Sequence, residues 1–310
     1  MGGKTLSLIA GTTACNAKCA FCISKTTPFQ DMTPKFELIN VPRLQRACEL
    51  AKEAGISVVM ITGKGEPTMY ADHDGAHIPQ YLEVLRRFGF DRIELQTNAL
   101  LFGQRPEKYD AFLKLWRNLG LSLIAISIVH YDPKRNAVQY TPDHDYVDLP
   151  AVLRKLHDFG YKTRLSCTLV KGYIDSIEEM QKMIHFAIEN GVDQLTLRKL
   201  AAVDVSEDKD ISMWTREHML SEEVISAIQH HLGSEGRLVE RFFYGASLYE
   251  YGPTRQNVCL TNGLTEENRT GEIRQLIFFP GQEGRIITDW RYDQTVDDNP
   301  LVQLNGGKKK

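Results

Sequence analysis

Short apolar runs alternate with amphipathic helical patterns up to about residue 200, and this alternation restricts the fold more than any other feature. Runs typical of buried strands lie at residues 5–10, 57–62, 92–97, 121–127, 162–170 and 194–198. Helical patterns lie between them at 42–54, 78–88, 106–119, 149–159 and 177–190. Repeated βα units predict a parallel sheet with right-handed crossovers. Six units are too few to close an eight-stranded barrel, so we expect an α/β fold, a partial (β/α)6 TIM-like barrel over residues 1–200.

The pattern changes after residue 200. Ser221 followed by Glu222 and Glu223 is typical of a helix N-terminus, and the helix is expected to reach His231. Strand-like runs at 274–279 and 285–290 flank a glycine-containing turn and predict a β-hairpin. We therefore expect residues 201–310 to form a C-terminal extension with a helix and a β-hairpin that shapes the substrate site, and its tail at 305–310 to be disordered.

Composition and charge exclude some classes of protein and favour others. The formal net charge of -3 argues against a large nonspecific nucleic-acid footprint. The chain shows no signal-peptide pattern and no run of ~20 apolar residues, so no membrane partner is expected. Of six cysteines, three are clustered, which indicates metal ligation in a reducing compartment rather than a disulfide framework. We expect a cytoplasmic protein.

The clustered cysteines are Cys15, Cys19 and Cys22, spaced C-x3-C-x2-C directly after the first expected strand. A closed zinc site has four ligands, and an ordinary cubane iron–sulfur cluster has four thiolates. Three thiolates on one loop would hold three corners of a [4Fe–4S] cluster and leave one iron open. The alternative is a non-enzymatic zinc-binding module that takes a fourth ligand from elsewhere, either a histidine or one of the remaining cysteines, Cys48, Cys167 and Cys259.

The cysteine motif, together with Gly63-Lys-Gly-Glu-Pro67 after the second expected strand, resembles the radical S-adenosylmethionine (radical SAM) superfamily. The second segment is similar to the family's Gly-Gly-Glu-Pro segment, from which Lys64 departs. The resemblance covers roughly residues 4–200 and suggests a single-cluster member loosely similar to the molybdenum-cofactor GTP cyclase branch. The chain lacks the second, C-terminal cysteine cluster of that cyclase, which argues against the same activity.

The resemblance implies an oxygen-sensitive enzyme with two cofactors. Cys15, Cys19 and Cys22 would hold a [4Fe–4S] cluster, and S-adenosylmethionine would chelate the open iron. An electron from an external donor such as flavodoxin or ferredoxin would then cleave S-adenosylmethionine to a 5′-deoxyadenosyl radical, which abstracts hydrogen from a substrate. The substrate is expected to be a small polar metabolite or nucleotide, with a ribosomal peptide or an RNA base as alternatives. The reaction subclass is left open.

The resemblance also assigns contacts with S-adenosylmethionine, and each has a plainer interpretation. Phe21 would lie beside the adenine, or is simply a buried aromatic. Glu66 would accept from the methionyl ammonium, or fixes the fold. Arg198 would meet the methionyl carboxylate, or forms an internal salt bridge. The remaining expected contacts are Gly63, Gly65 and Pro67 near the ammonium, and Asn98, Ser127 and Ser166 near the ribose or carboxylate.

Strand alternation and thiol chemistry suggest places for two further cysteines, Cys167 and Cys259. On the fifth expected strand Arg164, Ser166 and Thr168 share one face, so they are predicted to point into the barrel, opposite Cys167. Cys259 stands apart from the motif; it is either a buried small hydrophobe or a thiol that donates a hydrogen atom during catalysis.

Overall fold

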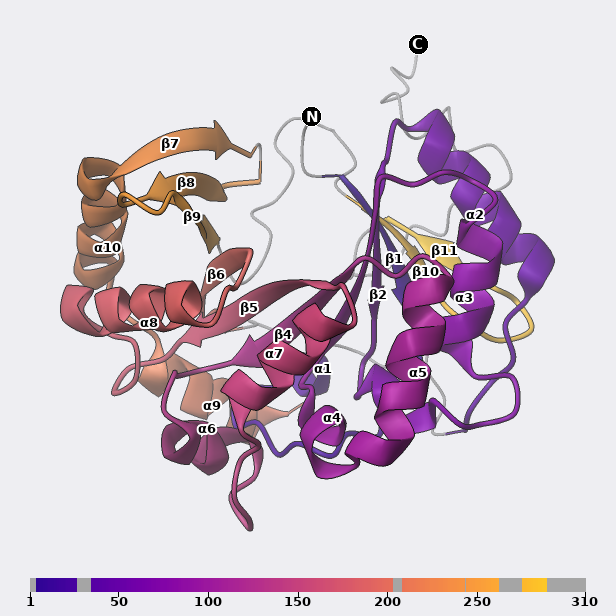
Figure 1. The fold of residues 1–310 in the computed structure, drawn as a ribbon, viewed down its shortest axis with the longest axis horizontal. Coiled ribbons are helices and arrows are strands. Elements are labelled where there is room, and N and C mark those ends of the chain that lie inside the picture. Colours follow the sequence, from indigo (N-terminus) through magenta and orange to yellow (C-terminus); the bar gives the residue numbers. More distant parts are fainter. Residues whose placement is uncertain (1–3, 27–34, 203–207, 243, 262–274, 289–310) are drawn as a thin grey trace.

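A computed structural model describes residues 4–26, 35–202, 208–242, 244–261 and 275–288 (Figure 1). Its centre is one 11-stranded sheet with the order β11-β10-β1-β2-β3-β4-β5-β6-β9-β8-β7. Neighbouring strands from β1 to β6 are parallel, and the sheet curves without closing, with helices along its outside (Figure 1). The expected partial-barrel α/β fold is confirmed.

All six strands and five helices expected in the first part of the chain are present, with ends that differ by only a few residues. The strands are β1 Thr5–Ile9, β2 Val58–Thr62, β3 Arg92–Thr97, β4 Leu123–Ile128, β5 Lys162–Leu169 and β6 Gln194–Lys199. The helices are α2 Val41–Glu53, α3 His77–Leu85, α5 Pro106–Asn118, α7 Leu149–Asp158 and α8 Ile177–Glu189. Shorter elements that the sequence did not predict are α1 Ile23–Thr26, η1 Pro67–Tyr70, α4 Leu100–Gln104 and α6 Pro133–Tyr140.

Local sequence explains where these helices begin. The side chains of Asn40, Asp148 and Ser176 accept hydrogen bonds from backbone N–H groups three residues ahead, at 3.1, 3.0 and 3.2 Å. Each satisfies one of the donors that an α-helix leaves free in its first turn. The caps therefore fix the start of α2, α7 and α8 relative to the strands before them.

The alternation of β5 decides which side chains reach the interior. Leu165, Cys167 and Leu169 are fully buried in the core between sheet and helices, whereas Ser166 and Thr168 lie on the opposite face. Cys48, on α2, is equally buried. The inward-facing polar set predicted from the period of two is therefore present.

The region after residue 200 adds strands to both edges of the sheet. The expected helix is α10 Glu222–Glu235, capped by Ser221, and the expected hairpin is β10 Gln275–Phe278 with β11 Ile286–Ile287. Residues 289–290 of the expected second strand and the tail at 305–310 lie outside the described residues. Elements that were not predicted are α9 Lys209–His218, β7 Gly236–Arg241, β8 Ser247–Tyr251 and β9 Gln256–Thr261.

Two parallel pairings join this region to the barrel. β9 lies beside β6, and β10 lies beside β1. The division of the chain at residue 200 stays a prediction, since one continuous sheet crosses it.

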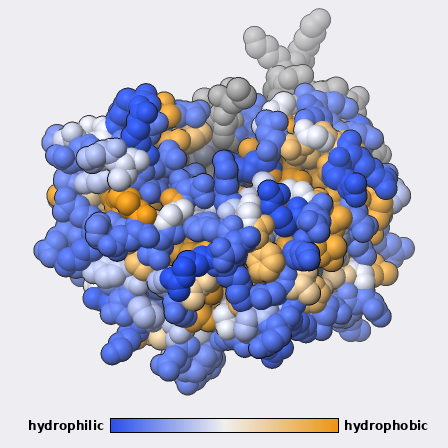
Figure 2. All heavy atoms as spheres, in the orientation of Figure 1, coloured by the Kyte–Doolittle hydropathy of each residue, from blue (hydrophilic) through white to orange (hydrophobic). Residues whose placement is uncertain are grey.

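The surface seen in Figure 2 is mainly hydrophilic, with apolar patches between the polar side chains. Large apolar side chains with high exposure, such as Leu38, Val138 and Met213, come from separate parts of the chain. Among the helices that the structure describes, none is long and apolar enough to cross a membrane.

Candidate active site

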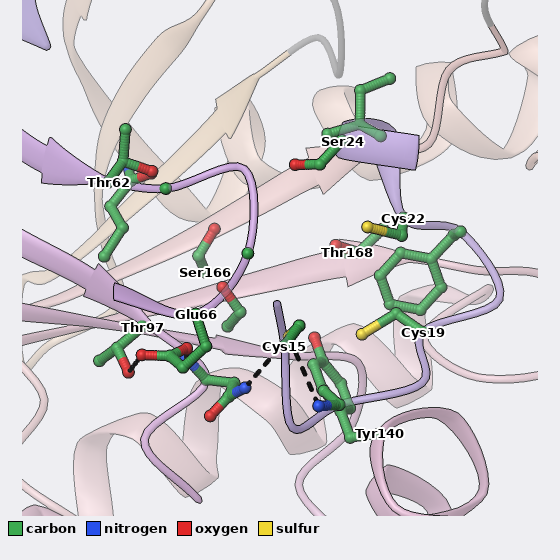
Figure 3. Close-up of a pocket in the computed structure, with 18 of the residues that line it drawn as sticks. Cys15, Cys19, Cys22, Ser24, Thr62, Glu66, Thr97, Tyr140, Ser166 and Thr168 are labelled. Carbon is green, nitrogen blue, oxygen red and sulfur yellow. Dashed lines mark hydrogen bonds between the residues drawn. The ribbon is translucent and has the colours of Figure 1, made fainter. Parts of the chain in front are cut away.

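The C-terminal ends of the barrel strands surround a pocket of about 260 Å³ (Figure 3). The three clustered cysteines line it, and so does every residue that the sequence predicted to contact a cofactor. These residues are Phe21, Gly63, Gly65, Glu66, Pro67, Asn98, Ser127, Ser166 and Arg198. Positions that are far apart in the sequence thus meet at the end of a parallel sheet where α/β barrels build their sites.

The cysteine loop connects β1 to α1, and all three of its cysteines are free thiols. Desolvation raises the pKa of Cys15 to about 11, against a backbone N–H of Ala17 that lowers it. Burial, together with the neighbouring Cys22 and Cys15, raises the pKa of Cys19 still further. Thiolates crowded in this way repel one another, so a bound cation is what would stabilise their charged form.

The three remaining cysteines do not line this pocket. Cys48 and Cys167 are packed in the core, and Cys259 lies on β9. Within the described ranges, no group of three or more His, Cys, Asp or Glu side chains is arranged to hold a single metal ion.

The segment from Gly63 to Pro67 packs against the cysteine loop through its backbone. The N–H of Gly65 donates to the carbonyl of Thr12 at 3.1 Å, and the N–H of Glu66 donates to the carbonyl of Ala14 at 2.9 Å. A Cβ at Gly65 would lie 2.0 Å from the carbonyl oxygen of Ala14. Only glycine allows this approach, so the two chemistry-bearing motifs form one interlocked unit.

Glu66 is 3% exposed, and its carboxylate accepts four hydrogen bonds from the protein. Thr68 donates from its N–H at 3.0 Å and its hydroxyl at 2.6 Å, Thr97 donates at 2.6 Å, and the N–H of Asn98 donates at 2.8 Å. Burial raises the pKa of Glu66, and these donors oppose the rise. The contacts tie the end of β3 to the segment after β2 (Figure 3), which favours the fold-fixing interpretation of this residue.

Asn98 contacts the cysteine loop directly. Its Nδ2 donates to Oδ1 of Asn16 at 2.8 Å and to Sγ of Cys15 at 3.8 Å. The N–H of Ala17 donates to the same sulfur at 3.4 Å. Because the Asn98 Oδ1 also accepts from the N–H of Leu100 at 3.0 Å, the amide is held in place and orients the first cysteine.

Two aromatic side chains, Phe21 and Tyr140, line the pocket on another side, and Trp214 packs against Phe21 without lining the pocket. The ring centroid of Phe21 lies 6.0 Å from that of Tyr140 on α6 and 6.1 Å from that of Trp214 on α9. Trp214 in turn stacks on His218 at 3.9 Å. Sequence reasoning missed Tyr140 and Trp214, although Asp132 before Pro133 is a helix-start signal that could have located α6.

Polar side chains from inner strand positions form the remaining wall. Ser127 comes from β4, and Ser166 and Thr168 come from β5 (Figure 3). Thr62 and Gln96, which the sequence reasoning also missed, hydrogen-bond to each other at 3.2 Å. Both occupy alternate inward positions of β2 and β3, so the period of two could have found them.

A second cavity, of about 820 Å³, lies deeper in the barrel and shares Gln96 and Arg198 with the first. Cys259 lines this second cavity and not the first, in register with Thr196 of β6. Burial raises the pKa of Cys259 to about 11, opposed by the nearby guanidinium groups of Arg164 and Arg198. Its thiol therefore keeps its proton at neutral pH.

Comparison with known proteins gives a consistent result. A family model described as the radical SAM superfamily matches residues 9–187. The chain is 22% identical over 276 residues to a GTP 3′,8-cyclase of Rhizobium leguminosarum bv. trifolii. The aligned region covers 86% of this chain and 73% of that protein. It is 26% identical over 242 residues to a GTP 3′,8-cyclase of Staphylococcus carnosus. This aligned region covers 76% of this chain and 63% of that protein.

Solved structures share the fold. Streptococcus suis SuiB bound to S-adenosylmethionine is similar with a TM-score of 0.58 at 16% identity, over 98% of this chain and 67% of that one. Methylornithine synthase (PylB) is similar with a TM-score of 0.54 at 15% identity, over 87% of this chain and 74% of that one. These similarities establish the partial-barrel fold. Because the identities are only 16% and 15%, they establish the fold alone.

Proposed function

Because the chain belongs to the radical SAM superfamily and is therefore a radical SAM enzyme, we propose that it cleaves S-adenosylmethionine reductively and modifies a small polar metabolite or nucleotide. Members of this family use S-adenosylmethionine and an iron–sulfur cluster. The observation that carries the proposal is the single pocket in which Cys15, Cys19 and Cys22 meet the Gly63–Pro67 segment and the polar ends of the barrel strands.

The residues of the pocket fit a [4Fe–4S] cluster. Three thiols lie on one short loop, and Asn98 and Ala17 direct hydrogen bonds to Sγ of Cys15. The raised pKa values of Cys15 and Cys19 mean that binding the cluster must release protons from this loop. When bound, the cluster supplies the electron for cleavage of S-adenosylmethionine, and the resulting radical can take hydrogen from an unactivated C–H bond.

The same pocket supports the contacts assigned to S-adenosylmethionine. Phe21 supplies an aromatic surface for the adenine. Gly63, Gly65 and Pro67 present backbone toward the methionyl ammonium, and Glu66 holds that backbone in place through its four protein donors. Arg198 provides a cation for the methionyl carboxylate. Ser127 and Ser166 offer hydroxyl groups to the ribose or carboxylate, and Asn98 contributes by orienting Cys15.

A small polar substrate is favoured by the relatives and by the second cavity. The curated relatives are GTP 3′,8-cyclases, and a cavity of about 820 Å³ is of the size that small molecules occupy. A ribosomal peptide is the second candidate, because one structural neighbour is described as bound to a precursor peptide. An RNA base ranks third, because a chain with a net charge of -3 attracts nucleic acid only weakly.

Cys259 is proposed as the hydrogen donor that completes the reaction. Its thiol would give a hydrogen atom to the substrate radical, and the sulfur radical left behind would take one electron from an external reductant and one proton from solvent. A donor such as flavodoxin or ferredoxin, in the reducing cytoplasm, would serve as this reductant and would also reduce the cluster.

The test is anaerobic reconstitution followed by measurement of iron and of 5′-deoxyadenosine under dithionite. The wild-type protein is expected to bind about four iron atoms and release 5′-deoxyadenosine without a second substrate. Cys19→Ala should lose both properties, whereas Cys48→Ala, which removes a core thiol remote from the pocket, should keep them. One zinc per chain and no 5′-deoxyadenosine would instead establish the zinc-binding module.

A further inference from the structure

We propose that the second cavity is the substrate chamber, that its mouth lies at the N-terminal ends of the strands, away from the cysteine loop, and that it takes a small molecule carrying a phosphate or carboxylate group. This rests on the proposed function, since it assigns the substrate class of that enzyme. Three features of the cavity support this proposal: its course along the strands, its charge and its aromatic lining.

The cavity runs along the strands from their first residues to the level of the cysteine pocket. Thr5, Val58 and Arg92 line it, and each is the first residue of its strand. Gln96 and Arg198 line its other end and also line the cysteine pocket. From Arg92 to Gln96 the path along β3 is four residue steps, about 13 Å. A molecule of nucleotide size can therefore enter at the strand starts and reach the pocket where S-adenosylmethionine is proposed to bind.

The inner wall carries a charge that an anion would compensate. Glu94, 2% exposed, pairs with Arg164 at 2.6 and 3.1 Å, and the Nε of Arg92 lies 3.5 Å from the same carboxylate. One carboxylate facing two guanidinium groups leaves this trio with a net charge of +1. Arg164 is largely buried, with 13% of its side chain exposed, whereas Arg92 is 43% exposed. Guanidinium groups in such partly desolvated places bind carboxylate and phosphate strongly.

The part of the lining that the structure describes has the same sign. It holds four cationic side chains, Lys4, Arg92, Arg164 and Arg198, against three anionic ones, Asp91, Glu94 and Glu240. The chain as a whole has a net charge of -3, so these described lining residues differ in sign from the overall balance.

An aromatic pair contributes another part of the lining. Phe242 and Tyr244 both line the cavity, and their ring centroids are 5.3 Å apart in a stacked arrangement. A cationic wall together with an aromatic surface suits an anion that also carries a planar ring. Cys259 lines the same chamber near Arg198, so a substrate held here would have the cysteine pocket at one end and the thiol beside it.

The experiment measures binding of GTP, citrate and guanosine to the reconstituted enzyme by anaerobic calorimetry. We expect an anion to bind at least tenfold more tightly than neutral guanosine; GTP alone would identify a phosphate site, and citrate alone a carboxylate site. Arg92→Gln should weaken the binding about tenfold. Arg87→Gln, which alters an exposed arginine outside the cavity, should leave it unchanged. If neither anion binds more tightly than guanosine, the proposed class is wrong.

Glu94→Gln provides a test of opposite sign. It keeps the shape of the side chain and removes the carboxylate charge, so the two arginines attract an anion more strongly and binding should tighten several-fold. If Glu94, Arg164 and Arg92 only stabilise the fold, binding should be unchanged or weaker, and either result would overturn the inference.

Hydrogen exchange locates the bound anion. Exchange should slow at residues 57–60 and 91–96 on anion binding; slowing confined to the cysteine loop would refute the location of the mouth. Release of 5′-deoxyadenosine by the wild-type enzyme is measured separately. If the enzyme releases it but binds neither anion more tightly than guanosine, only this inference fails. If the enzyme does not release it, the proposed function fails.

Discussion

Gly65→Ala is expected to separate the two motifs of the site. The added Cβ would lie 2.0 Å from the carbonyl oxygen of Ala14, 2.6 Å from its carbonyl carbon and 2.7 Å from that of Thr13. All three contacts are with backbone, so no side-chain rotation can relieve them. The loops must move apart by more than 1 Å, on the order of the gap between 2.0 Å and an ordinary contact of about 3.4 Å.

The cost follows from the contacts that this movement breaks. Two backbone hydrogen bonds join the loops, from Gly65 to Thr12 at 3.1 Å and from Glu66 to Ala14 at 2.9 Å. Each contributes a net ~1 kcal/mol, and overpacking costs typically ~1–3 kcal/mol more. We therefore expect the free energy of unfolding of the cluster-free protein to fall by about 3–5 kcal/mol, and the cysteine loop to lose most of its iron on reconstitution.

Urea denaturation and iron analysis measure these two effects. Gly233→Ala is the matched control: Gly233 lies within α10, and a Cβ there would meet nothing within 4 Å. Alanine is the better helix former, so this control should be stabilised by ~0.5–1 kcal/mol and keep full iron binding. A Gly65→Ala protein as stable as wild type, with a full complement of iron, would refute the interlocked arrangement.

Three further predictions concern His77, Asn98 and Trp214. Burial lowers the pKa of His77 to about 4, whereas a histidine in the unfolded chain has a pKa of ~6.5. The unfolded chain therefore binds a proton at higher pH than the folded protein does. The free energy of unfolding should fall as the pH drops from 6.5 towards 4, by about 2 kcal/mol at pH 5. Urea denaturation at several pH values should show this slope in the cluster-free protein but not in His77→Gln. Asn98→Ala removes a donor to Sγ of Cys15 and should lower the cluster's midpoint potential in a redox titration followed by electron paramagnetic resonance; an unchanged or higher potential would contradict the contact. Trp214→Ala should weaken S-adenosylmethionine binding several-fold in equilibrium dialysis, because Phe21 loses one of its ring neighbours, and Trp214→Phe should restore most of it.

Much of the fold was predictable because the sequence states it locally. The strands β1 to β6 and their helices are marked by apolar periodicity and by glycines that follow the helices. The strand β7 escaped prediction for a physical reason. It begins at Gly236, directly after α10 ends at Glu235, and its largely exposed residues show little apolar periodicity.

The site was predictable where one stretch of chain supplies the chemistry. The cysteine loop and the Gly63–Pro67 segment each show their character in a few adjacent residues, and Ser166 followed from alternation along one strand. Tyr140 and Trp214 did not, because their approach to Phe21 depends on how α6 and α9 pack. The place of Cys259 also depends on tertiary structure, since the pairing of β9 with β6 sets its depth in the barrel.

The pairing of β1 with β10 has a consequence for biosynthesis. Thr5 pairs with Gln275, so one neighbour of β1 is made 270 residues after it. At typical translation speeds of ~5–20 residues per second, this strand waits about 15–50 s on the ribosome with that edge unpaired. The cysteine loop begins where β1 ends, so its first anchoring strand gains both neighbours only late in synthesis. Maturation of the metal centre is therefore expected to follow translation of β10 rather than accompany the emergence of the cysteines.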